Sequence, residues 1–388
     1  MRRLLARRPR AATCDVGAAP SEDESFMRLA LREAEKGIGR TSPNPAVGAV
    51  LVKNGRVIAR GHHERAGGPH AEVVALRAAG GRARGADLYV TLEPCNHWGK
   101  TPPCSLAVLQ TGVRRIVVGS RDPNPVVNGR GLARLRRAGV EVVTDVLREE
   151  CDALNAHWFR FITSGRPFVT LKAAVTLDGK IATGGGDSRW VTGPAAREEV
   201  HRMRDRADAV LVGAGTARAD DPLLTTRLPR GEGRDPVRVV LDARLTLPRS
   251  LRLFHPRSAA PTLVATTARC PGRFGPGVET ISCRSAGGRV DLGDLLSKLA
   301  ERGIAHLLVE GGAEVHQSFL AAGLVDRVVV FLAPKILGGG KAWLAGEGPR
   351  LMAGALPLED VEVRRVGDDL MVSGAPVWPS GLRRSRSR

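Results

Sequence analysis

The chain has 388 residues, of which 43% are hydrophobic and 26% charged, as in ordinary soluble globular proteins. This length exceeds what one hydrophobic core usually organises, so we expect two domains. No apolar run approaches the roughly 18 residues of a membrane-spanning helix, and the apolar stretch near the N-terminus is too short for a secretory signal. We therefore expect a cytoplasmic protein with no membrane partner.

The net charge of +19 resembles that of nucleic-acid-binding proteins, but its distribution argues against such a function. Five arginines fall in the first ten residues and four in the last eight. Aromatic residues make up only 4% of the chain, so few rings could stack on bases. We expect a disordered Arg-rich extension over residues 1–20 rather than a transit peptide, a basic tail over 379–388, and no nucleic-acid partner.

The first predicted elements occupy residues 21–147. Ser21 followed by Glu24 forms a capping box, which predicts a helix. Two apolar stretches joined at Asn54–Gly55 predict a β-hairpin. Further on, strand and helix patterns alternate, which predicts an α/β sandwich on a mostly parallel sheet.

Residues 148–165 predict a helical linker that ends at a glycine and a proline. From 166 to 378, near-continuous apolar strands alternate with helical patterns, as in a parallel sheet buried on both faces. The expected strands lie at 167–175, 207–213, 237–243, 261–267, 305–310 and 326–334, and the expected helices at 194–207, 294–303 and 313–323. The two halves show no repeat, so we expect two different α/β domains.

Six cysteines are too few for a disulfide framework in a chain of this length, so a close pair indicates a metal or catalytic site. Cys95 and Cys104 form such a pair, with eight residues between them. Upstream, Pro69 suits the first turn of a helix, which places His70 and Glu72 at the helix start. The order His-x-Glu, strand, Pro-Cys and Cys is that of zinc deaminases, whose zinc binds the histidine and both cysteines.

Hydrolytic deamination explains why these residue types are needed. Three protein ligands leave the fourth position of zinc open for a water, whose pKa the metal lowers to ~7. The hydroxide attacks an amidine-like ring carbon, and ammonia must leave protonated. One group must carry the proton from the water to the ring and the leaving nitrogen, and Glu72, two residues after His70, is placed to do so.

Simpler interpretations exist for each residue taken alone. His70 could be a structural histidine, and Cys95 and Cys104 could form a disulfide loop or remain buried thiols. His97 has a spacing that suits a ligand, but a structural site of Cys95, His97 and Cys104 would lack a fourth residue, and structural zinc sites are closed. The complete pattern favours a catalytic zinc site that His97 lines.

The stretches TSPNPAVGAV (41–50), HAE (70–72) and EPCNHWGKTPPC (93–104) together closely resemble the bifunctional deaminase–reductase family of bacterial riboflavin biosynthesis. The resemblance implies a cytidine-deaminase-like α/β/α sandwich with one zinc ion per chain. The implied substrate is 2,5-diamino-6-ribosylamino-4(3H)-pyrimidinone 5′-phosphate, which loses its ring amine at C2. Asn44 is a candidate for binding the pyrimidine. Lys100 stands where relatives carry arginine, which keeps the charge but loses a bidentate phosphate contact.

The second half has no G-x-G-x-x-G motif, but a strand leads into Gly311–Gly312 and a helix. Such a turn can cradle a phosphate and is also a common α/β connection. Each of the other Gly-rich segments at strand ends, taken alone, could be an ordinary loop. Together, over residues 167–345, they resemble the reductase half of the same family, which implies a dihydrofolate-reductase-like fold and NADPH as cofactor.

The resemblance implies that hydride passes from NADPH to C1′ of the ribosyl group of 5-amino-6-(5-phosphoribosylamino)uracil, which becomes ribityl. The residues that it assigns to the cofactor are Ala174, Trp190, Thr216, Asp220, Gly312, Ala313, Glu314, Val315, His316, Gln317 and Ser318. Those that it assigns to the substrate are Ser188, Arg204, Leu224, Arg227 and Glu310. Lys172 or Asp178 could transfer the proton. Arg204 could instead be a solvated arginine, and Trp190 a core residue.

The sequence thus favours a bifunctional enzyme that acts on a phosphorylated pyrimidine and, as its relatives suggest, self-associates. A nucleic-acid-editing zinc deaminase with an appended binding domain would have closely spaced cysteines and more aromatic residues. A non-enzymatic zinc module that binds RNA would have four closed ligands. The free Glu72 beside three ligands argues against this non-enzymatic module.

Overall fold

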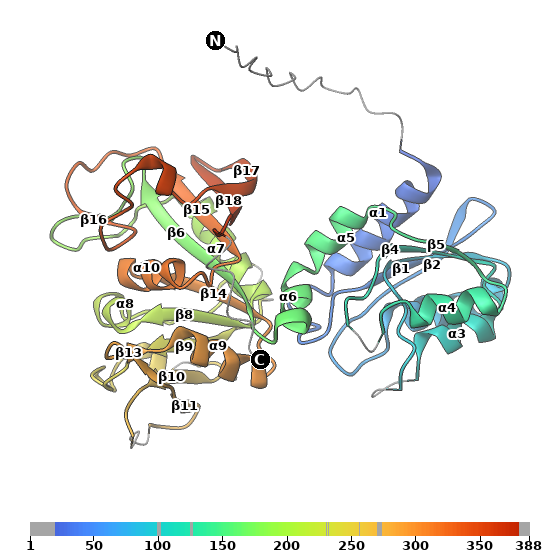
Figure 1. Ribbon diagram of the computed structural model, residues 1–388, viewed down its shortest axis with the longest axis horizontal. Helices are drawn as coiled ribbons and strands as arrows, with labels where there is room; N and C mark the ends of the chain where they lie inside the picture. Colours follow the sequence, from blue (N-terminus) through green and yellow to red (C-terminus); the bar gives the residue numbers. More distant parts are fainter. Residues whose placement is uncertain are drawn as a thin grey trace, which may run out of the picture.

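The computed structural model describes residues 20–98, 102–124, 127–229, 231, 233–255, 257–269 and 274–379. The expected Arg-rich extension and basic tail lie almost wholly outside these residues, as does Lys100. Two sheets lie side by side, with helices between them (Figure 1). None of the described helices is long and apolar enough to cross a membrane.

The first sheet has the strand order β2-β1-β3-β4-β5. Its strands are β1 (Gly48–Lys53), β2 (Arg56–His62), β3 (Asp87–Leu92), β4 (Arg115–Ser120) and β5 (Glu141–Val143). β1 pairs antiparallel with β2 and β3, whereas the β3–β4 and β4–β5 pairs are parallel. β1 is therefore the one strand of this sheet that runs against the other four. The predicted hairpin at Asn54–Gly55 accounts for the antiparallel β1–β2 pair, and β1 also pairs antiparallel with β3.

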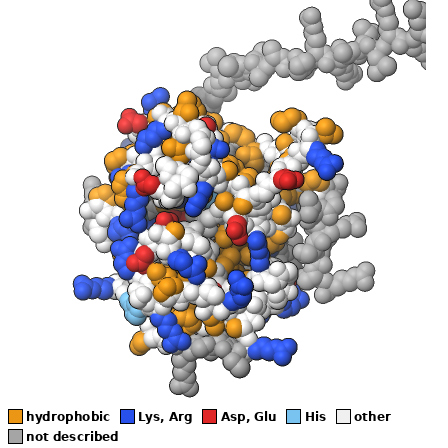
Figure 2. Space-filling model, turned by 90° about the vertical axis from the view of Figure 1, so that its left-hand side faces the viewer, with side chains coloured by type: hydrophobic (Ala, Val, Ile, Leu, Met, Phe, Trp, Pro, Cys, Tyr) orange, Lys and Arg blue, Asp and Glu red, His pale blue; other side chains and the backbone are white. Residues whose placement is uncertain are grey.

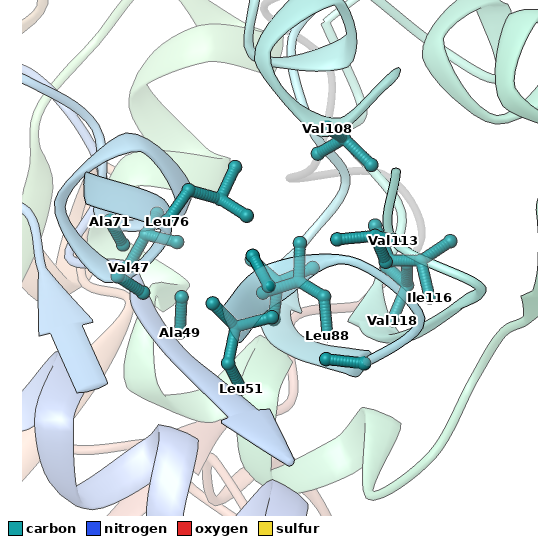
Figure 3. Close-up of a cluster of buried hydrophobic side chains, with 14 of the residues drawn as sticks. Val47, Ala49, Leu51, Ala71, Leu76, Leu88, Val108, Val113, Ile116 and Val118 are labelled. Atoms are coloured by element: carbon teal, nitrogen blue, oxygen red, sulfur yellow. The ribbon is translucent and has the colours of Figure 1, made fainter. Parts of the chain in front are cut away.

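Helices cover both faces of this sheet. They are α1 (Glu22–Glu35), α2 (Ala71–Ala79), α3 (Cys104–Thr111), α4 (Arg130–Arg137), α5 (Arg148–Leu154) and α6 (Ala156–Ser164), with a 3₁₀ turn at Gly80–Ala83. The predicted capping box of Ser21 and Glu24 begins α1. Figure 3 shows the core on the face that α2, α3 and α4 cover, where side chains such as Leu76, Leu88 and Val108 point toward one another. α1 and α5 pack on the opposite face.

The predicted linker forms the helices α5 and α6. Trp158 of α6 is buried in the first core, and Cys151 of α5 is buried against α1 and the sheet. Between the two helices, the buried amide of Asn155 accepts from the backbone N–H of Ala46 (2.9 Å) and donates to its carbonyl (2.8 Å). These helices therefore pack against the first sheet rather than running free between the two halves.

The second sheet has the order β11-β10-β9-β8-β14-β6-β15-β18-β17. Its strands are β6 (Phe168–Thr176), β8 (Ala209–Gly213), β9 (Val237–Leu241), β10 (Thr262–Thr266), β11 (Val278–Ser282), β14 (His306–Gly311), β15 (Arg327–Ala333), β17 (Leu358–Val366) and β18 (Asp369–Pro376). The sheet is parallel from β11 to β15, and β18 and β17 add an antiparallel edge. All six strands expected from the apolar runs are present.

Helices also cover both faces of the second sheet. α7 (Pro194–Arg206) and α8 (Ala214–Asp220) pack on one face, and α9 (Leu292–Glu301) and α10 (Ala313–Ala321) on the other. The remaining short elements are β7 (Lys180–Ala182) paired with β16 (Lys341–Ala342), β12 (Ser285–Ala286) paired with β13 (Arg289–Val290), and 3₁₀ turns at Arg252–Phe254 and Met352–Gly354. Open parallel sheets bind their ligands at the carboxyl ends of the strands.

Candidate functional sites

Three predicted ligand side chains from separate segments meet beside the first sheet. His70 is the N-cap of α2, Cys95 follows β3, and Cys104 is the first residue of α3. Nδ1 of His70 lies 3.1 Å from Sγ of Cys104 and 3.6 Å from Sγ of Cys95, and all three donor atoms lie within 4.8 Å of one another. Bonds to zinc of about 2.0 Å from nitrogen and 2.3 Å from sulfur bring ligand atoms about this close, so the donors fit one zinc ion.

The two cysteines of this site are free thiols, so the alternative of a disulfide loop is wrong. The backbone N–H of Cys104 points at Sγ of Cys95, 3.4 Å away. Hydrogen bonding from Cys104, helped by His70, outweighs burial and lowers the pKa of the Cys95 thiol. A thiolate is the form in which cysteine binds a metal.

Glu72 lies in the first turn of α2, next to the three ligands. The helix begins at Ala71, so Pro69 precedes the helix rather than lying in its first turn as predicted. The Glu72 side chain is buried, and this burial raises its pKa, although the nearby His70 opposes the effect. A raised pKa makes a carboxylate a stronger base, which suits a group that takes up and passes on a proton.

Asn44 and His63 form a hydrogen-bonded pair beside His70. The side-chain N–H of Asn44 lies 3.1 Å from Nε2 of His63, and Nδ1 of His63 lies 2.9 Å from the carbonyl of Pro69. A carbonyl can only accept, so Nδ1 of His63 carries the proton and Nε2 accepts from Asn44. Burial lowers the pKa of His63, in agreement with this neutral form. The rings of His63 and His70 meet edge to face at 5.3 Å.

Sequence reasoning missed His63, because one of two adjacent histidines at the end of a strand carries no motif. His97 is exposed and is not among the three side chains whose donor atoms converge. Its expected place lining the site stays a prediction.

A cavity of about 1960 Å³ opens at the carboxyl ends of the parallel strands of the second sheet. All the residues that the sequence assigned to the substrate line it: Ser188, Arg204, Leu224, Arg227 and Glu310. Ten of those assigned to the cofactor also line it: Ala174, Trp190, Thr216, Asp220, Gly312, Ala313, Glu314, Val315, His316 and Ser318. Gln317 lies on α10 beside Gly346 and is not part of this lining, so its role stays a prediction.

The turn from β14 into α10 requires glycine. Gly312 has a φ of 88°, and a Cβ atom there would lie only 2.8 Å from Oγ1 of Thr216. The N-terminus of α10 therefore reaches the cavity with its backbone close to α8. Free N–H groups at a helix N-terminus suit a phosphate group.

Three charged side chains meet at the floor of this cavity. Glu310 accepts from Nε and Nη2 of Arg204 at 2.6 and 2.8 Å, and Nζ of Lys172 lies 3.6 Å from the same carboxylate. Burial alone would raise the pKa of Glu310, but Arg204 and Lys172 lower it to about 2. Burial lowers the pKa of Lys172. The alternative that Arg204 is merely solvated is wrong.

Trp190 and Asp178 differ in how they relate to this cavity. The Trp190 side chain is 64% exposed beneath the guanidinium of Arg197 (4.5 Å), so the alternative that Trp190 is a core residue is wrong. Asp178 accepts from Thr176 and from the backbone N–H groups of Leu337 and Gly338, which lowers its pKa to about 2. It holds the loop after β15 and is not part of the cavity lining, which leaves Lys172 as the better candidate for proton transfer.

Sequence reasoning also missed most of the basic residues of the cavity. The lining includes Arg189, Arg218, Arg244, Arg252, Arg289 and Lys341. The high arginine content hid them, since no pattern separates a lining arginine from a solvated one. Their positive charge suits a ligand that carries several phosphate groups.

Comparisons with known proteins agree with both sites. The family model described as the RibD C-terminal domain matches residues 167–372, and that of the cytidine and deoxycytidylate deaminase zinc-binding region matches residues 20–120. The riboflavin biosynthesis protein RibD of Actinobacillus pleuropneumoniae is 43% identical, over 92% of this chain and 96% of that protein. That of Aquifex aeolicus is 45% identical, over 90% and 97%.

Solved structures that cover 92% of this chain give the same result. A diaminohydroxyphosphoribosylaminopyrimidine deaminase/5-amino-6-(5-phosphoribosylamino)uracil reductase from Thermotoga maritima has a TM-score of 0.82 and 41% identity, and covers 92% of this chain and 99% of its own. RibD of Acinetobacter baumannii has a TM-score of 0.83 and 35% identity over the same shares.

The predictions of the family, of a cytidine-deaminase-like domain followed by a dihydrofolate-reductase-like domain, and of a bifunctional enzyme are confirmed. The alternatives of a nucleic-acid-editing deaminase and of an RNA-binding zinc module are wrong. The reductase domain implies a nicotinamide cofactor. The chain belongs to the RibD family, whose members join a zinc-binding deaminase and a reductase for riboflavin biosynthesis.

Proposed function

We propose that the chain catalyses two successive reactions on one pyrimidine. It first deaminates 2,5-diamino-6-ribosylamino-4(3H)-pyrimidinone 5′-phosphate, and then reduces 5-amino-6-(5-phosphoribosylamino)uracil with NADPH. The Thermotoga maritima relative is described by both activities. The observation that carries the proposal is the meeting of His70, Cys95 and Cys104 beside the buried Glu72.

In the deaminase site, His70, Cys95 and Cys104 hold one zinc ion, which supplies an activated water at neutral pH when bound. Glu72 would take a proton from the attacking water and pass it to the ring nitrogen. It would then take the proton of the hydroxyl group now on C2 and give it to the amine. As the C2=O bond forms, the bond from C2 to the amine breaks and ammonia leaves. Asn44, fixed by His63, binds the pyrimidine beside this site.

In the reductase site, the cofactor residues named above would hold NADPH, and the free N–H groups at the N-terminus of α10 would suit one of its phosphate groups. The cofactor would supply the hydride for C1′, and the sugar ring oxygen that leaves C1′ takes a proton. The largely buried Lys172, whose Nζ lies 3.6 Å from Glu310, is the proposed donor of this proton. Arg204 is paired with Glu310, whereas Arg227 is exposed. Among the described residues its guanidinium donates to Thr225, and its backbone N–H donates to His201. Arg227 is therefore the better ligand for the substrate 5′-phosphate.

We also propose the expected division into a deaminase domain (21–147), a helical linker (148–165) and a reductase domain (166–378). The family matches at 20–120 and 167–372 support it. The enzyme acts in the cytoplasm, self-associates and binds no nucleic acid. In support of the last point, the described Lys and Arg side chains on the face that Figure 2 shows are scattered among acidic and apolar ones.

Replacing Cys104 by serine is expected to remove zinc, because a neutral hydroxyl is a poor ligand for this ion. The zinc content measured after dialysis should fall from about one ion per chain to nearly none. The half-buried Cys283 of the reductase half provides the control, and Cys283→Ser should keep its zinc. A Cys104→Ser protein that keeps full zinc would show that Cys104 is no ligand.

Replacing Glu72 by alanine should slow ammonia release at least about a hundredfold, since the proton shuttle is lost. Zinc content and NADPH oxidation on the deaminated intermediate should remain, because neither depends on this carboxyl. Glu35→Ala, on the exposed face of α1, is the control. Loss of zinc from Glu72→Ala would instead make Glu72 a ligand.

Replacing Arg227 by alanine should raise the KM for the reductase substrate roughly 10- to 100-fold, the effect of losing a charged hydrogen bond. Deamination by the same protein should be unchanged. Arg302→Ala, an exposed arginine after α9, should alter neither activity. Unchanged reductase kinetics in Arg227→Ala would rule out the phosphate contact.

A further inference from the structure

The loop between α1 and β1 carries Asn44 and touches the reductase half. Nη2 of Arg40 donates to both carboxylate oxygens of Asp205, at 2.9 and 3.0 Å. The hydroxyl of Ser42 donates to Oδ2 of Asp208 at 2.7 Å. We call Arg40, Ser42, Asp205 and Asp208 the interdomain clamp.

The reductase side of the clamp is fixed independently of the deaminase. Asp208 is buried, and its Oδ2 also accepts the backbone N–H groups of Ala305 and His306, both at 2.9 Å. Asp205 also accepts the backbone N–H of Arg234, at 2.7 Å. Both carboxylates are therefore held by their own domain, and they fix the loop rather than follow it.

The close contact between this loop and the end of α7 also requires a glycine in the loop. Gly39 has a φ of 73°, and a Cβ atom there would lie 2.6 Å from the carbonyl oxygen of Asp205. The backbone of the loop thus lies directly against the end of α7. This close approach shows that the loop is seated on the reductase half and does not merely reach it through long side chains.

From the clamp, a short series of contacts leads to the metal ligands. Thr41 bonds to Asn44 twice, through its hydroxyl to the Asn44 carbonyl (3.1 Å) and through its own carbonyl to the Asn44 N–H (2.8 Å). The Asn44 side chain then meets His63, which bonds to the carbonyl next to His70. Beyond Asn44, the loop is held by Asn155 within the deaminase half.

We propose that Asp205 and Asp208 of the reductase half are positioning residues for the deaminase reaction. They hold the loop so that Asn44 meets the pyrimidine. The inference rests on the proposed function, because it takes Asn44 as a substrate contact. The inference gives the reductase half a role in the deaminase reaction.

A double-mutant cycle on the full-length zinc-loaded enzyme tests this role. Arg40→Ala and Asp205→Ala should each raise the KM for 2,5-diamino-6-ribosylamino-4(3H)-pyrimidinone 5′-phosphate about three- to tenfold, with kcat within about twofold. The double variant should be no worse than the worse single one, since both remove one interaction. Arg202→Ala, whose partners lie on α7 itself, is the matched control and should match the unmodified enzyme.

A second pair of variants separates positioning from general stability. Ser42→Ala should raise the same KM, and Ser42→Thr, which keeps the hydroxyl, should restore it. Zinc content and reductase activity should stay normal in Arg40→Ala and Ser42→Ala. Unchanged deaminase KM, multiplying effects in the double variant, or loss of zinc or reductase activity in Ser42→Ala would each overturn the inference. If the unmodified enzyme released no ammonia, the proposed function itself would fail.

Discussion

The three donors of the metal site come from separate segments of the chain, so the fold must bring them together. Here an imidazole at the start of α2 and two thiols, one after β3 and one at the start of α3, lie within 4.8 Å of one another. Both helices pack on the same face of the first sheet, through the core in Figure 3. Packing of α2 and α3 on β1, β3 and β4 therefore sets the geometry of the metal site.

The reductase cavity depends on a different constraint, the mutual compensation of charged side chains that are buried together. A lone carboxylate at the position of Glu310 would be costly, but Arg204 and Lys172 compensate it, so the cavity floor keeps three charged groups away from bulk water. The C-terminal end of α7 joins the two sites. Arg204 belongs to the reductase cavity, and the next residue, Asp205, holds the deaminase loop.

Local patterns predicted much of this structure. The Asn54–Gly55 hairpin, the capping box at Ser21 and the buried strands of the second sheet each follow from a few neighbouring residues. The family motifs supplied the metal ligands. Pairing of β1 with β3 could not be predicted, because strand direction across a sheet depends on contacts distant in sequence. The same reason hid His63, the basic cavity lining and the clamp, whose partners lie up to 166 residues apart.

X-ray absorption at the zinc edge of the purified enzyme tests the account most directly, since it reports which atoms surround the metal. The structure predicts two sulfur ligands at about 2.3 Å and two nitrogen or oxygen ligands at about 2.0–2.1 Å, one from His70 and one from water. A shell of four protein ligands, or one without sulfur, would contradict the account.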